Sequence, residues 1–187
     1  YIKEDSVLTP IKGSIEKDKD PYYPRQYKLV GDFKTDIFYQ VDIDSAAFYD
    51  YYGNHNNAIE VLFRIKPIDN YATFTLNVKN IEGEAFVEMI TKTDEVIRRE
   101  QVKNNMAKFI HITPGEYFFR LIEDKNGNGL WDTGDYSQGL PPEYVYYLPK
   151  RIKFRKNWDV EEEWDVKEIP LEEQRPSDLA ISKKQSK

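Results

Sequence analysis

The chain has 187 residues, of which 40% are hydrophobic and 14% aromatic, and it carries a formal net charge of −6. This composition is too apolar for a wholly disordered chain, and the interspersed charges lack the basic stripe of a nucleic-acid-binding protein. The absence of cysteine excludes disulfide frameworks, thiolate zinc sites and cysteine nucleophiles. No apolar run approaches the roughly 20 residues of a membrane-spanning helix.

Residues 1–67 are predicted to form a partial Ig-like β segment that packs on or precedes the next domain. The opening stretch is polar and broken by prolines, and IEKDKDPYYPRQ (15–26) is typical of an exposed loop. Strand-like composition follows at residues 27–33, 37–44 and 58–66. The intervening DSAAFYDYYGNHNN (44–57) is predicted to be a loop.

A domain boundary is predicted at PIDNY (67–71), after which short strands recur about every ten residues. In the first of them, Phe74, Leu76 and Val78 occupy one face. The predicted strands cover residues 71–79, 84–92, 95–102, 107–113, 116–123, 143–149 and 151–156. This rhythm predicts an all-β fold, with an antiparallel β-sandwich over residues 68–166. Residues 167–187 are polar and contain two prolines, so we expect an extended or mobile tail.

The stretch DKNGNGLWDTGD (124–135) gathers oxygen-bearing side chains directly after an apolar strand. Its spacing matches a calcium-binding loop, with ligand oxygens at positions 1, 3, 5, 7 (a backbone carbonyl), 9 and 12 and a glycine at position 6. The glycine is Gly129. The candidate metal ligands are Asp124, Asn126, Asn128, Leu130, Asp132 and Asp135. Calcium is the expected ion, because zinc would require His or Cys in the loop.

Two features of this loop differ from the usual calcium-binding pattern. Position 12 is Asp135 rather than the longer bidentate glutamate. The loop also follows a strand rather than a helix, so a bound ion would stabilise a long β connection instead of opening a helix pair. The alternative is a glycine-rich turn in which Asn and Asp side chains bond only to the local backbone.

Four motifs resemble those of bacterial Ig-like domain-containing cell-envelope proteins. They are PGEY (114–117), the DKNGNGLWDTG stretch (124–134), PEYV (142–145), and NWDV with WDV (157–160 and 164–166). Upstream, VDIDSAAFYDYYG (41–53) is similar to a further stretch of that family. The order of strand, PGxY and Asp/Asn loop is also similar to transthyretin-like and carboxypeptidase-regulatory-like sandwiches.

The resemblance implies an exported protein of the periplasm, outer membrane or cell surface, built from β-sandwich domains. It also implies that an N-terminal lipid-attachment cysteine and an Ig-like domain precede Tyr1, so the membrane would be reached only through that anchor. No family activity can be transferred to particular residues. The implied role is structural or adhesive, with an unidentified protein or glycan partner and no nucleic acid.

The tryptophans and tyrosines suggest a second function. Trp131, Trp158 and Trp164 could stack on sugar rings, although sealing the sandwich core is the simpler interpretation. The tyrosines of residues 48–53 and 144–147 have the same two interpretations. A glycan-binding module is therefore the alternative function, and an accessory domain of a carbohydrate-active enzyme is a third.

Catalysis is not expected from this sequence. The acidic run at residues 161–163 has no partner at a defined separation and is typical of a solvated face. His55 and His111 are isolated in the sequence, and Ser45 lacks the glycines of a nucleophile elbow. We therefore expect a non-enzymatic structural or interaction module with a candidate calcium site at residues 124–135.

Overall fold

The computed structural model describes residues 1–4, 7–20 and 22–179. It confirms the predicted all-β class, since the longer elements are all strands and the helices are short 3₁₀ turns. The chain separates into two compact units. The first comprises Tyr1–Lys19 and Tyr23–Pro67, and the second comprises Asp20–Tyr22 and Ile68–Lys187. The last eight residues of the predicted tail, 180–187, lie outside the described residues.

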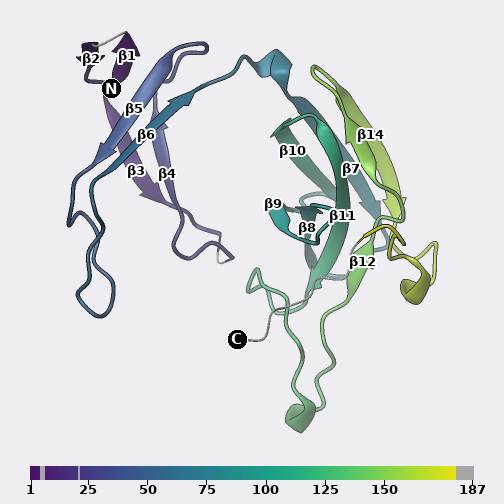
Figure 1. Cartoon of the computed structure of the whole chain (residues 1–187). Coiled ribbons are helices and arrows are strands. Elements are labelled where there is room, and N and C mark those ends of the chain that lie inside the picture. The colour runs from purple at the N-terminus through teal and green to yellow at the C-terminus, as the bar shows by residue number, and fades with distance from the viewer. Residues whose placement is uncertain (5–6, 21, 180–187) are drawn as a thin grey trace. The chain divides into compact units, whose positions relative to one another are not determined.

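The first unit contains a four-stranded antiparallel sheet and a two-stranded ribbon (Figure 1). The sheet has the order β2-β1-β5-β6, formed by Val7–Thr9, Ile2–Glu4, Phe38–Ile43 and Ile59–Arg64. The ribbon pairs β3 (Gly13–Lys17) with β4 (Tyr27–Gly31). Strands β1 to β3 were not predicted, because they are short and lie in the polar opening stretch, where no alternating pattern marks them.

The first unit has a small core of aromatic rings. Tyr39 is only 1% exposed. Its ring lies 5.0 Å from the ring of Phe33 and 5.4 Å from that of Phe63. The Tyr39 hydroxyl accepts a hydrogen bond from the backbone N–H of Lys34 at 2.7 Å, which satisfies its polar end. Three rings thus hold the β5–β6 pair against the segment that precedes it.

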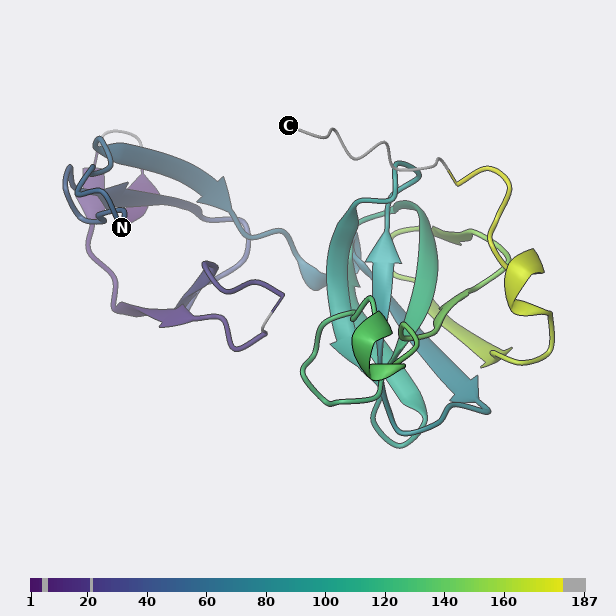
Figure 2. The same cartoon turned by 90° about the horizontal axis from the view of Figure 1, so that it is seen from below.

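The second unit is sandwich-like, with two sheets facing each other (Figures 1 and 2). The smaller sheet has the order β10-β7-β14, formed by Met106–Ile112, Ala72–Lys79 and Asp159–Asp165. The larger has the order β12-β11-β8-β9, formed by Val145–Tyr147, Gly115–Asp124, Glu84–Ile90 and Val96–Gln101. Strand β13 (Ile152–Phe154) pairs with the start of β11. An Ig-like or transthyretin-like topology remains a prediction.

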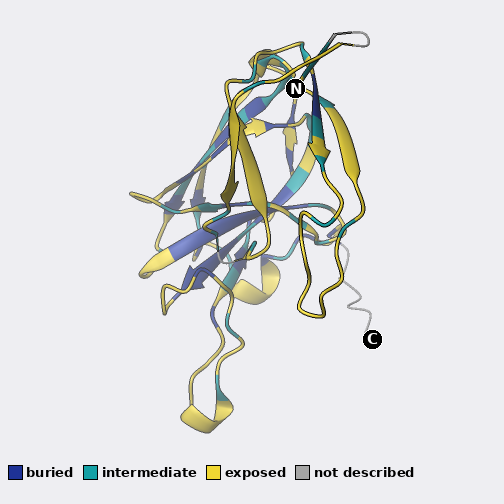
Figure 3. Ribbon diagram, turned by 90° about the vertical axis from the view of Figure 1, so that its left-hand side faces the viewer, coloured by how far each residue is buried: buried dark blue, intermediate teal, exposed yellow. Residues whose placement is uncertain are grey.

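The main core lies between these two sheets and contains a cluster of four phenylalanines. Phe74 comes from β7 and Phe109 from β10, while Phe119 and Phe154 come from β11 and β13. The ring of Phe74 lies 4.6 Å from that of Phe119 and 5.5 Å from that of Phe154. Figure 3 shows the buried residues concentrated in the strands of the second unit. Apolar side chains from both sheets therefore close this sandwich.

The smaller sheet is not wholly antiparallel, which corrects the predicted arrangement. Strand β14 was not predicted, and it pairs in parallel with β7 over its full length, from Asp159 opposite Thr73 to Asp165 opposite Lys79. Its alternation is present, because Trp164 is buried while Glu161 and Glu163 are exposed. Three consecutive glutamates obscured that pattern in the sequence.

The larger sheet is buried on both faces at β8. Ala85, Val87 and Met89 belong to the main core, while Phe86, Glu88 and Ile90 are buried on the opposite face. Part of the predicted tail packs on that opposite face, where Leu179 joins a small cluster with Ile90 and Phe118.

The tail is fixed at one buried glutamine and does not simply extend into solvent as far as residue 179. After the 3₁₀ turn η3 (Leu171–Glu173), Gln174 is 2% exposed. Its Oε1 accepts from the N–H of Tyr147, and its Nε2 donates to the carbonyls of Val166 and Ile169. These bonds fasten the segment after β14 to strand β12.

Candidate metal-binding loop and its polar network

The 124–135 loop begins at the buried end of β11. Asp124 is the last residue of that strand and is only 3% exposed. Gly127 and Gly129 have φ values of +70° and +73°, a left-handed backbone that favours glycine. The long connection between β11 and β12 extends from the sandwich and carries the 3₁₀ turn η2 (Tyr136–Gln138), green in Figures 1 and 2.

Asp124 organises the start of the loop through its carboxylate. Oδ1 accepts from the backbone N–H of Asn128 at 3.1 Å, and Oδ2 accepts from that of Gly129 at 2.7 Å. Two N–H groups stabilise the charged form of a buried carboxylate and replace part of its lost hydration. The chain therefore folds back over the strand end at Asp124.

Asn126, Asn128 and Asp132 converge on one point beside this turn. Nδ2 of Asn126 and Nδ2 of Asn128 both donate to Oδ2 of Asp132, at 2.6 and 2.7 Å. The two amide oxygens accept from backbone N–H groups, Asn126 from Asn128 and Asn128 from Leu130. Four of the six predicted ligand residues are thus joined in one hydrogen-bonded cluster, and Leu130 contributes its backbone to the same turn.

Asp135 is engaged elsewhere. Its carboxylate caps η2, accepting from the hydroxyl and N–H of Ser137 and from the N–H and side-chain amide of Gln138. These bonds hold the pKa of Asp135 below its ordinary value. The largest cause is the bond from the Ser137 side chain, followed by the bond from the Ser137 backbone N–H. Asp135 also forms a β-bridge with Leu140. The structure therefore does not bring the predicted position-12 side chain into the Asp124 cluster.

Glu143 lies outside the 124–135 loop but holds it, and the ligand spacing did not point to it. It is 7% exposed, and its two carboxylate oxygens accept from the N–H groups of Lys125 and Asp132, at 2.9 and 3.0 Å. Its own N–H and carbonyl bond to the Asp132 carbonyl and to the Trp131 indole. Glu143 lies in the PEYV motif, but no pattern in the sequence predicts that it contacts residue 125.

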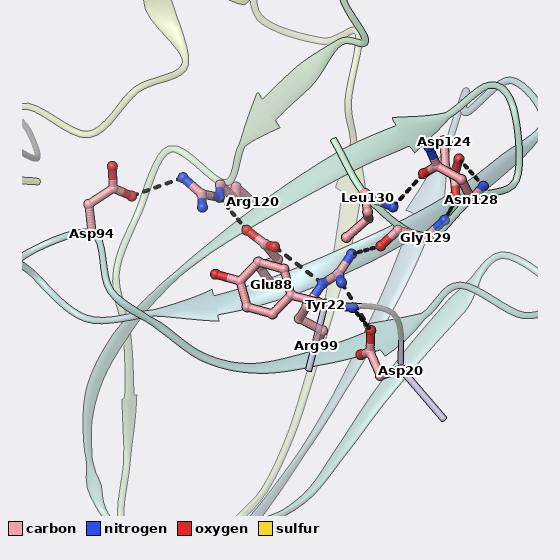
Figure 4. A network of polar contacts seen from close by, with 10 residues as sticks. All are labelled: Asp20, Tyr22, Glu88, Asp94, Arg99, Arg120, Asp124, Asn128, Gly129 and Leu130. Carbon is pink, nitrogen blue, oxygen red and sulfur yellow. Dashed lines mark hydrogen bonds and ion pairs between the residues drawn. The ribbon is translucent and has the colours of Figure 1, made fainter. Parts of the chain in front are cut away.

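Arg99 joins the loop to the larger sheet, as Figure 4 shows. Its Nη2 donates to the carbonyl of Gly129 at 2.6 Å, and its Nη1 pairs with Asp20 at 3.1 Å. The guanidinium carbon lies 3.8 Å from the centre of the Phe86 ring, close enough for a cation–π contact. Arg99 thus fixes the carbonyl beside the candidate ligands.

The network continues across neighbouring strands through Glu88. Glu88 Oε2 binds Arg120 Nε at 2.6 Å, and Arg120 also pairs with Asp94 at 3.0 Å. Arg99 Nε lies 3.2 Å from Glu88 Oε1, but it is out of line for a hydrogen bond, and no other described residue provides one. This contact is an ion pair without a directed bond.

The charges of Arg120 and Glu88 stabilise each other. Burial alone would lower the pKa of Arg120, but the carboxylate of Glu88 and the side chain of Tyr147 together raise it above its ordinary value. Arg120 therefore stays charged throughout the pH range in which proteins fold. Arg99, Glu88, Arg120 and Asp94 form a row of neighbouring charged side chains on the sheet's outer face.

The loop provides oxygen donors suited to a hard cation, but few carboxylates. Within the described part of the chain, no group of three or more His, Cys, Asp or Glu side chains could hold a metal ion. Amide and carbonyl oxygens also supply part of a calcium shell, and the loop contains both. Carboxylates of Asp124 and Asp132, with amides of Asn126 and Asn128, fit calcium chemically and exclude a zinc-type donor set.

The other candidates from the sequence are dispersed. Trp131 and Trp158 are 48% and 43% exposed, whereas Trp164 is 5% exposed in the core, so the three cannot form one platform. The carboxylates of Glu161, Glu162 and Glu163 bond to Asn77, Lys150 and Lys79 respectively. These three side chains make local surface contacts.

Comparison with protein-family models, curated proteins and solved structures finds no match for this chain. Within the ranges that the structure describes, no helix has the length and apolar character needed to cross a membrane.

Proposed function

We propose that this chain is a non-catalytic structural or interaction module of a bacterial cell-envelope protein, stabilised by calcium at the 124–135 loop. The observation that carries the proposal is the convergence of Asn126, Asn128 and Asp132 beside the buried Asp124. An ion bound there would neutralise the negative charge of the Asp124 and Asp132 carboxylates, which accept hydrogen bonds from backbone N–H groups and from the amides of Asn126 and Asn128.

The candidate ligands have distinct roles in this proposal. Asp124 orients the turn through two backbone N–H groups and retains lone pairs for a cation, because a carboxylate has about four acceptor sites. Asp132 would bind the ion through its carboxylate, and Asn126 and Asn128 would turn their amide oxygens toward it in place of the Nδ2 groups that now donate to Asp132. The Leu130 carbonyl is the backbone donor, and Asp135 would join only by leaving its cap on η2.

The surroundings of the loop favour a stabilising role over a switching one. Glu143 ties residue 125 to residue 132, and Arg99 ties Gly129 to the sheet. A loop fixed at both points has little freedom to transmit a movement. Calcium binding is therefore expected to raise the stability of the second unit without changing its fold.

The cell-envelope location rests on the resemblance of residues 113–166 to bacterial Ig-like domain-containing proteins. In that setting the chain acts after export, in the periplasm or at the outer membrane or cell surface. Anchoring would use a lipid attached N-terminal to Tyr1. The partner would be a surface protein or glycan, and the sandwich would serve as a spacer or adhesive module.

A thermal melt with and without calcium tests the metal site. At calcium 100-fold above the dissociation constant, selective binding to the folded state adds about 2.7 kcal/mol. For a chain of this size the midpoint should rise by roughly 5–10 °C. In Asp124→Ala the calcium-dependent rise should disappear, whereas in the control Asp135→Ala it should persist.

Two results would contradict this proposal. An unchanged midpoint at millimolar calcium would refute calcium stabilisation, and a full rise in Asp124→Ala would place the ion elsewhere. Loss of the rise in both variants would instead return Asp135 to the ligand set. Magnesium at the same concentration is the ionic-strength control.

A further inference from the structure

The first unit contains an aromatic loop that the proposed function does not use. Residues 44–57 connect β5 to β6 and extend beyond the ends of both strands (Figure 1). A β-bridge joins Tyr49 to His55, and the turn between them is completed by Gly53 at a φ of +82°. The loop is a built hairpin with an aromatic tip; we call it the tyrosine loop.

Two polar side chains fix the backbone of the tyrosine loop. The Asp50 carboxylate accepts from the N–H groups of Tyr52 and Asn54 and from the Asn54 side chain, at 2.8 to 2.9 Å. Asn56 accepts from the N–H of Phe48 and donates to the carbonyl of Asp44. Because these bonds already hold the turn, little conformational entropy remains to be lost on binding.

The tyrosine loop presents its rings to solvent. Tyr51 is 97% exposed, Tyr52 85% and Tyr49 66%. The rings of Tyr51 and Tyr52 lie 5.6 Å apart at an interplanar angle of 87°, which is a T-shaped pair with the edge of one ring directed at the face of the other. No hydrogen bond within the described residues engages the hydroxyl of any of the three. Rings and hydroxyls are therefore both available to a ligand.

A groove of about 750 Å³ lies along these rings. Its lining includes Arg25, Asn54 and His55 beside the tyrosines, and its volume is typical of a small-molecule site. Arg25 offers N–H donors, the second ring nitrogen of His55 can donate or accept according to its tautomer, and Asn54 retains its amide oxygen as an acceptor. Rigid aromatic rings interleaved with asparagine form a binding surface at low entropic cost.

We propose that the tyrosine loop binds a hydroxyl-rich carbohydrate, with a pyranose ring against Tyr51 or Tyr52 and its hydroxyls bonded to Asn54, His55 and Arg25. A pyranose presents C–H groups on one face and hydroxyls around its edge, which matches an aromatic face bordered by polar groups. A bound sugar would bury the polar groups of the groove, and its hydroxyls would replace the hydrogen bonds that these groups lose to water.

A membrane surface is the less suitable occupant. Binding at a lipid surface favours lysine and arginine beside the aromatic tip. Residues 44–57 contain neither, and they include Asp44 and Asp50, so Arg25 is the one lysine or arginine among the residues that line the groove. A single arginine beside two carboxylates gives an anionic headgroup little net attraction, whereas a neutral sugar needs none.

The carbohydrate site is independent of the calcium proposal. The tyrosine loop belongs to the first unit, and the 124–135 loop belongs to the second. Loss of calcium stabilisation in Asp124→Ala should leave carbohydrate binding intact, and loss of the tyrosines should leave the calcium-dependent melt intact. Each proposal can therefore fail alone.

Affinity electrophoresis of the full chain in gels containing soluble polysaccharides tests the site. The probes are glucomannan, xyloglucan, xylan, amylopectin, yeast mannan and gastric mucin. At least one should retard the protein, and the double variant Tyr51→Ala, Tyr52→Ala should weaken that binding about tenfold or more. The phenylalanine double variant should retain binding to within a few-fold, because it keeps both rings.

Tyr136→Ala is the matched control, because Tyr136 is also a fully exposed tyrosine but lies in the second unit. It should bind like the parent protein. The proposal is overturned if no probe retards the parent, if the alanine double variant binds equally well, or if Tyr136→Ala loses binding. Tyr51-dependent capture by phosphatidylglycerol vesicles, without retardation by any polysaccharide, would assign the loop to membranes and likewise overturn it.

Discussion

Glu88→Ala should strongly destabilise the second unit, because Glu88 lies between two arginines on the buried outer face of the larger sheet. The side chains of Glu88 and Arg99 are 5% and 3% exposed, and that of Arg120 is 20% exposed. Removing one partner of a buried ion pair costs about 3–5 kcal/mol, since the remaining charge is left without compensation. Arg120 retains Asp94 and Arg99 retains Asp20, so we expect the lower end of this range.

A surface ion pair with the same bond length provides the control. Glu163 binds Lys79 at 2.6 Å, the distance that also separates Glu88 from Arg120, but the side chains of Glu163 and Lys79 are 69% and 57% exposed. Exposed ion pairs contribute little to stability, because water already solvates both charges. Glu163→Ala should therefore have a small effect, and the difference between the two variants isolates burial.

Urea unfolding followed by tryptophan fluorescence measures both variants, with the buried Trp164 reporting on the core of the same unit. For Glu88→Ala the free energy of unfolding should fall by about 3 kcal/mol with an unchanged m-value. Glu88→Gln keeps the size of the side chain and one hydrogen bond. Its free energy of unfolding should therefore lie between those of Glu88→Ala and the parent protein. If Glu88→Ala and Glu163→Ala lose equal stability, the argument from burial is wrong.

Two further predictions concern the second unit. Gly134→Ala should cost roughly 2–4 kcal/mol in urea unfolding, because Gly134 has a φ of +77° and an added Cβ would lie 2.5 Å from a backbone oxygen. Gly139→Ala, at a φ of +66° with open space around it, should cost only about 1–2 kcal/mol; equal losses would exclude the clash. Gln174→Ala should cost about 2–3 kcal/mol and speed hydrogen exchange of the Tyr147 amide; an unchanged exchange rate would show that Gln174 does not hold the tail.

Alternation predicted the strands that have one buried and one exposed face. Phe74, Leu76 and Val78 are all buried, as their spacing in β7 indicated. The same rule failed for β1 to β3, because no core selects apolar residues there. It could not reveal which strands pair, so the parallel partnership of β7 with β14 became visible only in three dimensions.

At the candidate site, too, the sequence predicted the local contacts but not those between distant residues. The spacing of Asp124, Asn126, Asn128 and Asp132 is local, and one turn brings them together. Asp135 follows the turn at Gly134 and caps its own short helix instead. Glu143 and Arg99 reach the loop through the β11–β12 connection and the β8–β9 pairing, which a one-dimensional pattern does not encode.

The parallel pairing of β7 and β14 has a consequence for how the second unit is made. The bond from Asn77 to Glu161 joins residues 84 positions apart, and closing a loop of that length costs roughly 4 kcal/mol of chain entropy. During synthesis β7 can pair with β10 early, but its other edge stays open until residues 159–165 emerge. An open edge strand can pair with another chain. Aggregation during folding should therefore be most frequent in this interval, and a chaperone that shields β7 would reduce it.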